Sequence, residues 1–135
     1  MTERRPRPDD VGRVETVVDE TMLAAAVGSG AVLGLSTPTM IALMERAAVA
    51  AIADSLQPGT SSVGTRVDVQ HLAPTALGMK VVAEARVVAV DRRRVSFAVF
   101  ASDDRGPIGE GTHERAIIDS SRFAEALRQR QNGNE

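Results

Sequence analysis

The chain has 135 residues, of which 43% are hydrophobic and 25% charged, as is typical of a single globular domain. It contains no cysteine, which excludes disulfides, thiolate metal sites and a cysteine nucleophile. Its net charge of −2 and its lack of tryptophan and tyrosine argue against a nucleic-acid partner, which would need a basic or aromatic surface.

The N-terminal third begins with a charged, proline-rich stretch, residues 1–10, which we expect to be a flexible tail without the apolar segment of a signal peptide. No apolar run approaches the roughly 20 residues of a membrane span, so we expect a cytoplasmic protein that makes no membrane contact. Residues 11–21 are rich in β-branched side chains and predict a strand. Residues 22–36 are broken by glycines and predict an irregular or short helical segment.

A long helix is predicted next. Thr37 followed by Pro38 is typical of a helix start, with threonine as the N-cap, and the helix should continue to about Ser55. Apolar side chains occupy every face: Met40, Ile41, Leu43, Met44, Val49 and Ile52, with alanines between them. A helix that is apolar all round is expected to be buried on all sides.

Four β-like stretches and a short C-terminal helix complete the chain. The stretches are residues 60–73, 79–90, 94–102 and 107–118; Ser120 or Ser121 should cap the helix, and residues 131–135 should fray. A curved antiparallel sheet wrapped around the apolar helix gives an α+β fold, in one domain covering residues 11–130. One small sheet cannot cover the whole helix, so we expect a homodimer.

His71 ends the first of the four stretches and is one of two histidines. Val67, Val69 and His71 stand at alternate positions, so they share one face of the strand and are expected to point toward a buried surface. An inward histidine is often a core residue hydrogen-bonded to a backbone carbonyl. It also suits acid/base catalysis, because its ring is largely neutral near pH 7.

Glu45 interrupts the apolar helix. Burying its carboxylate is costly unless a donor compensates it, so Glu45 either forms a salt bridge, lies with Arg46 on a narrow polar stripe, or acts as a catalytic base or nucleophile. Thr37 is explained as an N-cap, although a hydroxyl at a helix N-terminus also lies where negative charge is stabilised. Thr37 and Glu45 are separated by roughly 12 Å along the helix, so a shared site needs another segment or a second subunit.

The remaining polar motifs are less specific. His113 lies in the polar stretch 111–115, which we interpret as a solvated outer face of its strand. Two isolated histidines do not make a zinc site, so we expect neither a metal nor a cofactor. The glycines around Ser29 lack the rest of a phosphate loop, and the arginines at 92–94 predict a solvated turn that could meet a phosphate.

Four motifs occur together in this chain. They are Leu43-Met44-Glu45 in the helix, Val63-Gly64-Thr65 leading to His71, Ala73-Pro74-Thr75, and residues 109–117 with Gly-Thr-His-Glu-Arg at their centre. This set resembles the fluoroacetyl-CoA thioesterase family over about residues 11–128, with the order of elements preserved. The resemblance implies the hotdog fold, an antiparallel sheet wrapped around one central helix, and a homodimer that hydrolyses an acyl-CoA.

The resemblance also implies roles for four residues. Thr37, Glu45 and His71 match the catalytic threonine, glutamate and histidine of the family, and Gly64 matches the glycine whose backbone amide contacts the substrate. In that family the two protomers build each pocket together at the dimer interface, which removes the problem of the distance between Thr37 and Glu45. We therefore expect His71 within reach of Glu45 in an interface pocket.

The segment before the central helix departs from the family. The fluoroacetyl-specific enzyme has a lid with phenylalanines there, whereas residues 27–34 contain no aromatic side chain. This puts fluoroacetyl selectivity in doubt and favours another short acyl group, or a longer one. The alternatives to a thioesterase are a non-catalytic hotdog dimer that binds an acyl thioester or hydrophobic small molecule, and a hotdog dehydratase or hydratase, which carries a histidine near the position of Thr37.

Overall fold

The computed structural model describes residues 5–133. They form one β-sheet, with a long helix against one face and shorter helices at its ends. The strands are β1 (Val11–Val17), β2 (Thr60–His71), β3 (Lys80–Asp91), β4 (Arg94–Asp103) and β5 (Gly106–Asp119). The helices are α1 (Ala24–Val27), α2 (Thr37–Ile52) and α3 (Ser120–Gln131), with short 3₁₀ turns η1 (Glu20–Met22) and η2 (Ala53–Ser55). No helix in this described part is long and apolar enough to cross a membrane.

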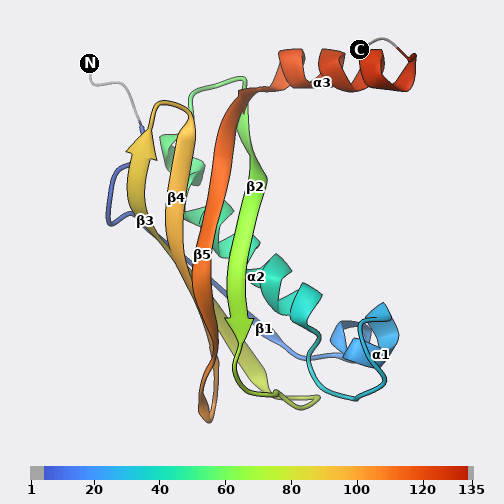
Figure 1. Cartoon of the computed structure of the whole chain (residues 1–135). Helices are drawn as coiled ribbons and strands as arrows, with labels where there is room; N and C mark the ends of the chain where they lie inside the picture. The colour runs from blue at the N-terminus through green and yellow to red at the C-terminus, as the bar shows by residue number, and fades with distance from the viewer. Residues whose placement is uncertain (1–4, 134–135) are drawn as a thin grey trace.

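The five strands form one antiparallel sheet in the order β1-β3-β4-β5-β2, and α2 lies across one face of it (Figure 1). The predicted α+β hotdog architecture is therefore confirmed, as are the four strands after the helix. β2, which carries His71, is an edge strand. Its outer side presents backbone donors and acceptors with no neighbouring strand among residues 5–133.

The packing of α2 differs from the expectation in one respect. Its inner side, Met40, Leu43, Met44, Ala47, Ala48 and Ile52, is buried against the sheet. Gly12 lets β1 cross close to it, because a β-carbon there would lie 2.1 Å from the carbonyl oxygen of Ala47. The opposite side is exposed and includes Arg46 and Val49, which is 44% exposed. The prediction that α2 is buried on all sides is thus wrong for one chain, because the sheet covers only one side of the helix.

The N-cap of α2 is Ser36 rather than Thr37. The Ser36 hydroxyl accepts a hydrogen bond of 3.1 Å from the backbone N–H of Thr39, the third residue of the helix, so the capping geometry is complete one residue earlier than predicted. This shift leaves the Thr37 side chain available for another contact. Similarly, Asp119 caps α3 in place of the predicted Ser120 or Ser121.

The segment before α2 is irregular, with one short helix, as predicted. α1 ends at Gly28 in the left-handed conformation, and short bridges tie Leu23 to Leu35 and Gly34 to Ala76. In the expected tail, residues 1–4 lie outside the described residues, while Asp9 and Asp10 exchange backbone hydrogen bonds of 2.8 Å with Val87. Of the C-terminal residues expected to fray, 134–135 also lie outside the described part.

Candidate active site

Thr37 and His71 meet at one end of the molecule. The first turn of α2 brings the Thr37 Oγ1 to 2.8 Å from His71 Nδ1, at the end of β2. His71 is half-buried on the edge strand; Val69 packs against the core, but Val67 is 40% exposed. The expected inward face is therefore only partly covered, because no further strand of the described residues lies beside β2.

The second ring nitrogen of His71 is left without a partner. Its Nε2 atom is buried and makes no hydrogen bond among residues 5–133. Buried polar atoms are nearly always paired, so an unpaired nitrogen indicates a group that a ligand or another chain satisfies. The partner of Nδ1 is a hydroxyl, so the interpretation as a core histidine bonded to a backbone carbonyl does not describe this ring.

An open hollow of about 360 Å³ adjoins the pair. Besides Thr37 and His71, it is lined by small or aliphatic residues from the α1 region and from the loop after β2, and it has no aromatic lining: Ala24, Ser29, Gly30, Val32, Gly34, Leu35, Leu72, Ala73 and Pro74. The hollow is therefore suited to a small or aliphatic group.

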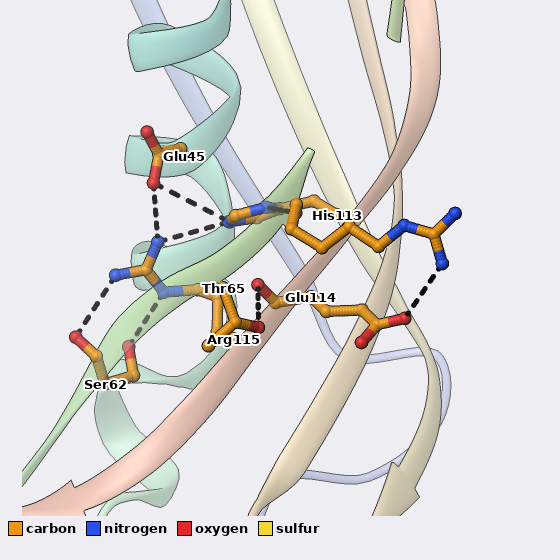
Figure 2. A network of polar contacts seen from close by, with 7 residues as sticks. Glu45, Ser62, Thr65, His113, Glu114 and Arg115 are labelled. Carbon is orange, nitrogen blue, oxygen red and sulfur yellow. Dashed lines mark hydrogen bonds and ion pairs between the residues drawn. The ribbon is translucent and has the colours of Figure 1, made fainter. Parts of the chain in front are cut away.

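Glu45 lies elsewhere, on the part of α2 that faces β5 (Figure 2). Arg115 Nη1 donates to Glu45 Oε2 at 3.1 Å, and His113 Nε2 lies 3.9 Å from the same oxygen. The Arg115 side chain is only 8% exposed, whereas that of Glu45 is 38% exposed. The predicted donor for this carboxylate exists, and the carboxylate still reaches the surface of the chain.

Gly64 supplies the space that Glu45 occupies. A β-carbon at Gly64 would lie 2.6 Å from Glu45 Oε2 and 3.3 Å from Arg115 Nη1, so any other residue at this position would have to displace the Glu45 carboxylate. The pairing of β2 with β5 shifts register between Gly64 and Arg66, which marks a bulge at Thr65. The Thr65 hydroxyl donates to the Glu114 carbonyl at 3.1 Å and holds this irregular turn of the strand.

His113 is buried, which corrects the expectation of a solvated face. It is 2% exposed, and its ring stacks on Phe97 with the ring centroids 5.9 Å apart. The alternation of β5 places Glu110, Thr112 and Glu114 outside and turns His113 toward α2. Glu110, Thr112 and Glu114 thus form the outer face, whereas His113 lies on the inner one, so the interpretation of His113 as solvated is wrong.

The partners of His113 define its protonation. Its Nδ1 lies 2.7 Å from the carbonyl oxygen of Arg66, so Nδ1 carries the proton and donates; Nε2 then accepts from Arg115 Nη1 at 3.2 Å. Burial lowers the pKa of His113, and the positive charge of Arg115 lowers it further, against the raising effect of the Arg66 carbonyl and of Glu45. The ring is thus a neutral acceptor that orients Arg115.

Arg115 is the residue of this cluster that sequence analysis missed. Its Nε donates to the Ser62 hydroxyl at 2.9 Å and its Nη2 to the Ser62 carbonyl at 3.1 Å, while Nη1 serves Glu45 and His113 (Figure 2). The guanidinium is therefore held on three sides. Arg115 lies two residues after His113 on β5, so the two side chains share the strand face that points toward Glu45. This alternation is the pattern that could have identified Arg115.

One chain thus holds the predicted residues in two places. Thr37 and His71 lie at the end of β2, whereas Glu45 and Gly64 lie beside its first half, and no contact joins His71 to Glu45 among the described residues. The same residues contain no group of three histidine, aspartate or glutamate side chains placed to hold a metal ion.

Comparisons with known proteins identify the family to which this chain is similar. Residues 18–121 match the family model of the fluoroacetyl-CoA-specific thioesterase. The fluoroacetyl-CoA thioesterase of Streptantibioticus cattleyicolor is 43% identical over 95 residues, which cover 70% of this chain and 68% of that protein.

Solved structures give the same result. A crystal structure of a fluoroacetyl-CoA thioesterase superposes with a TM-score of 0.85 at 34% identity, covering 91% of this chain and 96% of the other. A hypothetical protein of the thioesterase superfamily from Thermus thermophilus has a TM-score of 0.89 at 28% identity, with 96% of each chain covered. From the family match, the sequence identity and the shared hotdog fold, it follows that the chain belongs to the fluoroacetyl-CoA-specific thioesterase family.

Proposed function

We propose that the protein is a homodimeric thioesterase that hydrolyses an acyl-CoA, with Thr37, Glu45 and His71 as catalytic residues and Gly64 as a substrate contact. The observation that carries the proposal is the position of Glu45, a half-exposed carboxylate fixed by the buried Arg115 against Gly64, the glycine of β2. A solved relative is described as a complex with fluoroacetate and CoA, which supports a CoA thioester as the substrate class.

The chemistry follows from the groups present. Glu45, or a water molecule that it deprotonates, attacks the carbonyl carbon of the thioester, and the backbone amide of Gly64 stabilises the oxyanion. The carbon–sulfur bond then breaks, and His71 in its protonated form gives a proton to the departing sulfur of CoA; the proton removed from the attacking water restores His71 for the next cycle. If Glu45 attacks directly, water hydrolyses the resulting acyl anhydride; both routes end in a carboxylic acid and free CoA. Thr37 orients His71 through their 2.8 Å hydrogen bond.

Dimerisation would unite the two halves of the site. The free edge of β2 can pair with the same edge of a second copy, and antiparallel pairing places the His71 end of one strand beside the first half of the other. Thr37 and His71 of one copy would then face Glu45 and Gly64 of the second. The exposed side chains of Val67 and Val49, on β2 and on the outer side of α2, would be covered by the same contact.

The acyl group is the finer part of the proposal. The relatives are fluoroacetyl-CoA thioesterases by name, but the hollow beside His71 has no aromatic lining in this chain. Small and aliphatic walls favour a short acyl chain with no requirement for fluorine. A substrate of this kind also implies a cytoplasmic enzyme, because CoA thioesters are made and used inside the cell.

The test is release of CoA thiol from a panel of acyl-CoAs of increasing length, with fluoroacetyl-CoA included. We expect turnover by the wild type and a loss of at least about 100-fold in Glu45→Gln and in His71→Ala. Glu110→Gln, on the outer face of β5, is the matched control and should keep the wild-type rate. Wild-type rates in both Glu45→Gln and His71→Ala would refute the assignment of these residues to the active site. Calorimetric binding without thiol release would favour a non-catalytic binding protein, and hydration of an enoyl-CoA would favour a hydratase.

A further inference from the structure

The C-terminal helix α3 buries none of its residues against the rest of residues 5–133. It leaves the end of β5 and extends past the edge strand β2, away from the sheet (Figure 1). None of its residues is buried; Phe123 is 37% exposed and Leu127 is 56% exposed. The two are four residues apart and share one face of the helix, beside the half-buried Ala124. An isolated helix of this length is marginal in water, so its apolar face calls for a contact.

The base of α3 is fixed at the Thr60 end of β2. Asp119, the N-cap, pairs with Thr60, and the backbone N–H of Ser120 donates to the Gly59 carbonyl at 3.0 Å. α3 therefore starts from the corner where β2 begins, on the free side of the sheet, whereas His71 and the hollow lie at the other end of the same strand.

We propose that α3 docks on a second copy of this chain, over the entrance of that copy's hollow. The proposal rests on the homodimer proposed above: antiparallel pairing of two β2 edges puts the Thr60 end of one strand beside the His71 end of the other. α3 of one chain, extending past the edge, then reaches the surface around His71 of the second. Within one chain this contact is out of reach, because α3 and α1 lie at opposite ends of β2 (Figure 1).

The receiving surface has matching chemistry. Exposed aliphatic side chains flank the hollow and form what we call the entrance patch: Val27, Val32, Leu33 and Leu72, with Val32 65% and Leu33 73% exposed. Such a group of exposed aliphatic residues is typical of a surface that another element covers. The charges are complementary as well. α3 carries three arginines and one glutamate, whereas residues 19–36 carry Asp19 and Glu20 and no basic residue.

Docking would also supply the aromatic side chain that the entrance lacks. Of the three phenylalanines in the chain, Phe97 is buried under His113 and Phe100 projects from β4 on the outer face of the sheet. Phe123 is the one that a second copy can bring to the hollow. The wall of each hollow would then be completed in trans, by a residue that lies beyond the family match, which ends at residue 121.

The experiment is hydrogen exchange on the full-length protein, with the oligomeric mass measured by sedimentation. The test variant is Phe123→Ser/Leu127→Ser; the matched control is Glu125→Ser/Gln129→Ser, which changes the opposite face of α3 by the same number of serines and keeps its three arginines. We expect all three proteins to be dimers. The amides of residues 122–131 should be protected in the wild type and the control, and should exchange at least about tenfold faster in the test variant, as should residues 24–35.

The outcomes separate the two proposals. A monomeric wild type would refute the homodimer and the docking together. A dimeric test variant whose residues 24–35 exchange as slowly as in the wild type would refute the docking alone. Protection of α3 that appears only with vesicles of phosphatidylglycerol and phosphatidylcholine would overturn the docking in favour of a membrane surface, since α3 is basic and amphipathic.

Discussion

The carboxylate of Glu45 lies where the side chain of residue 64 would be: a β-carbon on Gly64 would approach its Oε2 atom to 2.6 Å. A helix side chain thus rests directly on the backbone of a strand. Arg115, the residue of β5 that pairs with Gly64, fixes it there at 3.1 Å. Helix, strand and guanidinium together determine the position of one carboxylate, so a change in any of the three should be read out in catalysis.

Gly64→Ala tests the contact from the strand side. The new methyl group would push the flexible Glu45 side chain away from Arg115, a displacement of about 1 Å, which can cost on the order of 100-fold in rate. Overpacking should lower the free energy of unfolding by only about 1–3 kcal/mol. Thiol-release kinetics and urea unfolding measure the two effects. An alanine variant with the wild-type kcat would show that the carboxylate position is not critical.

Arg115→Met tests the contribution of the guanidinium to the position of Glu45. Removal of the guanidinium leaves Glu45 without its cation, and the Ser62 carbonyl and His113 Nε2 without their donor. We expect a loss of about 2–4 kcal/mol in the free energy of unfolding, together with a fall in kcat. Arg115→Lys keeps the charge but not the planar fork, so it should recover less than half of the lost stability. Full recovery by lysine would mean that charge alone matters.

The sequence predicted the strands better than the contacts between them. Alternation and turn residues located β2 to β5, whereas Thr37, Glu45, Gly64 and His71 stay predictions that rest on their motifs. The partner of Glu45, Arg115, was not predicted. Arg115 and His113 belong to a polar stretch, and which of its side chains point inward depends on how β5 packs against α2. The bulge at Thr65, which helps to set that geometry, leaves no distinctive residue pattern.

Two other features depended on contacts remote in sequence. Ser36 and Thr37 are both good N-caps, and their roles are decided by where β2 ends, because His71 takes the Thr37 hydroxyl while Ser36 binds Thr39. The amphipathic pattern of α3 predicted a helix but not its direction. That direction follows from its start beside Gly59 at the corner of the sheet.

His113 should give the folded protein a pH dependence. Its pKa is lowered from the ordinary value of 6.5, so the unfolded chain binds a proton more readily than the folded one. The stabilisation is fully present above pH 6.5 and is lost as the pH falls below it, with a slope of at most about 1.4 kcal/mol per pH unit. His113→Asn keeps a donor for the Arg66 carbonyl and does not titrate, so its unfolding free energy should vary less between pH 6.5 and 5.5. The free energies are measured by denaturant unfolding at each pH. An equal dependence on pH in the variant and the wild type would contradict this assignment.

Thr37 can be tested without disturbing the helix start, because Ser36 makes the cap. Thr37→Val keeps the shape of the side chain but loses the hydrogen bond to His71, and should lower kcat by about 10–100-fold. Thr37→Ser keeps the hydroxyl and should remain within a few-fold of the wild type. Thermal unfolding should barely distinguish the two variants. If valine is as active as serine, the hydroxyl has no part in the reaction.

Subunit complementation tests whether two chains build each site. If Glu45 of one chain works with Thr37 and His71 of the other, then Glu45→Gln and His71→Ala, each inactive alone, restore one intact pocket when they form a mixed dimer. Random exchange makes half of the dimers mixed, and half of their pockets are intact, so the mixture should reach about a quarter of the wild-type rate.

The control for this experiment mixes Thr37→Val with His71→Ala. These residues contact each other within one chain, so every pocket of a mixed dimer keeps one lesion and the rate should not recover. Recovery in the first mixture and not in the second is the result that only a shared pocket produces. Failure of the first mixture to recover, with mixed dimers demonstrated by mass, would mean that each chain carries a complete site, and that Glu45 and His71 must come together by a movement of α2 against β2.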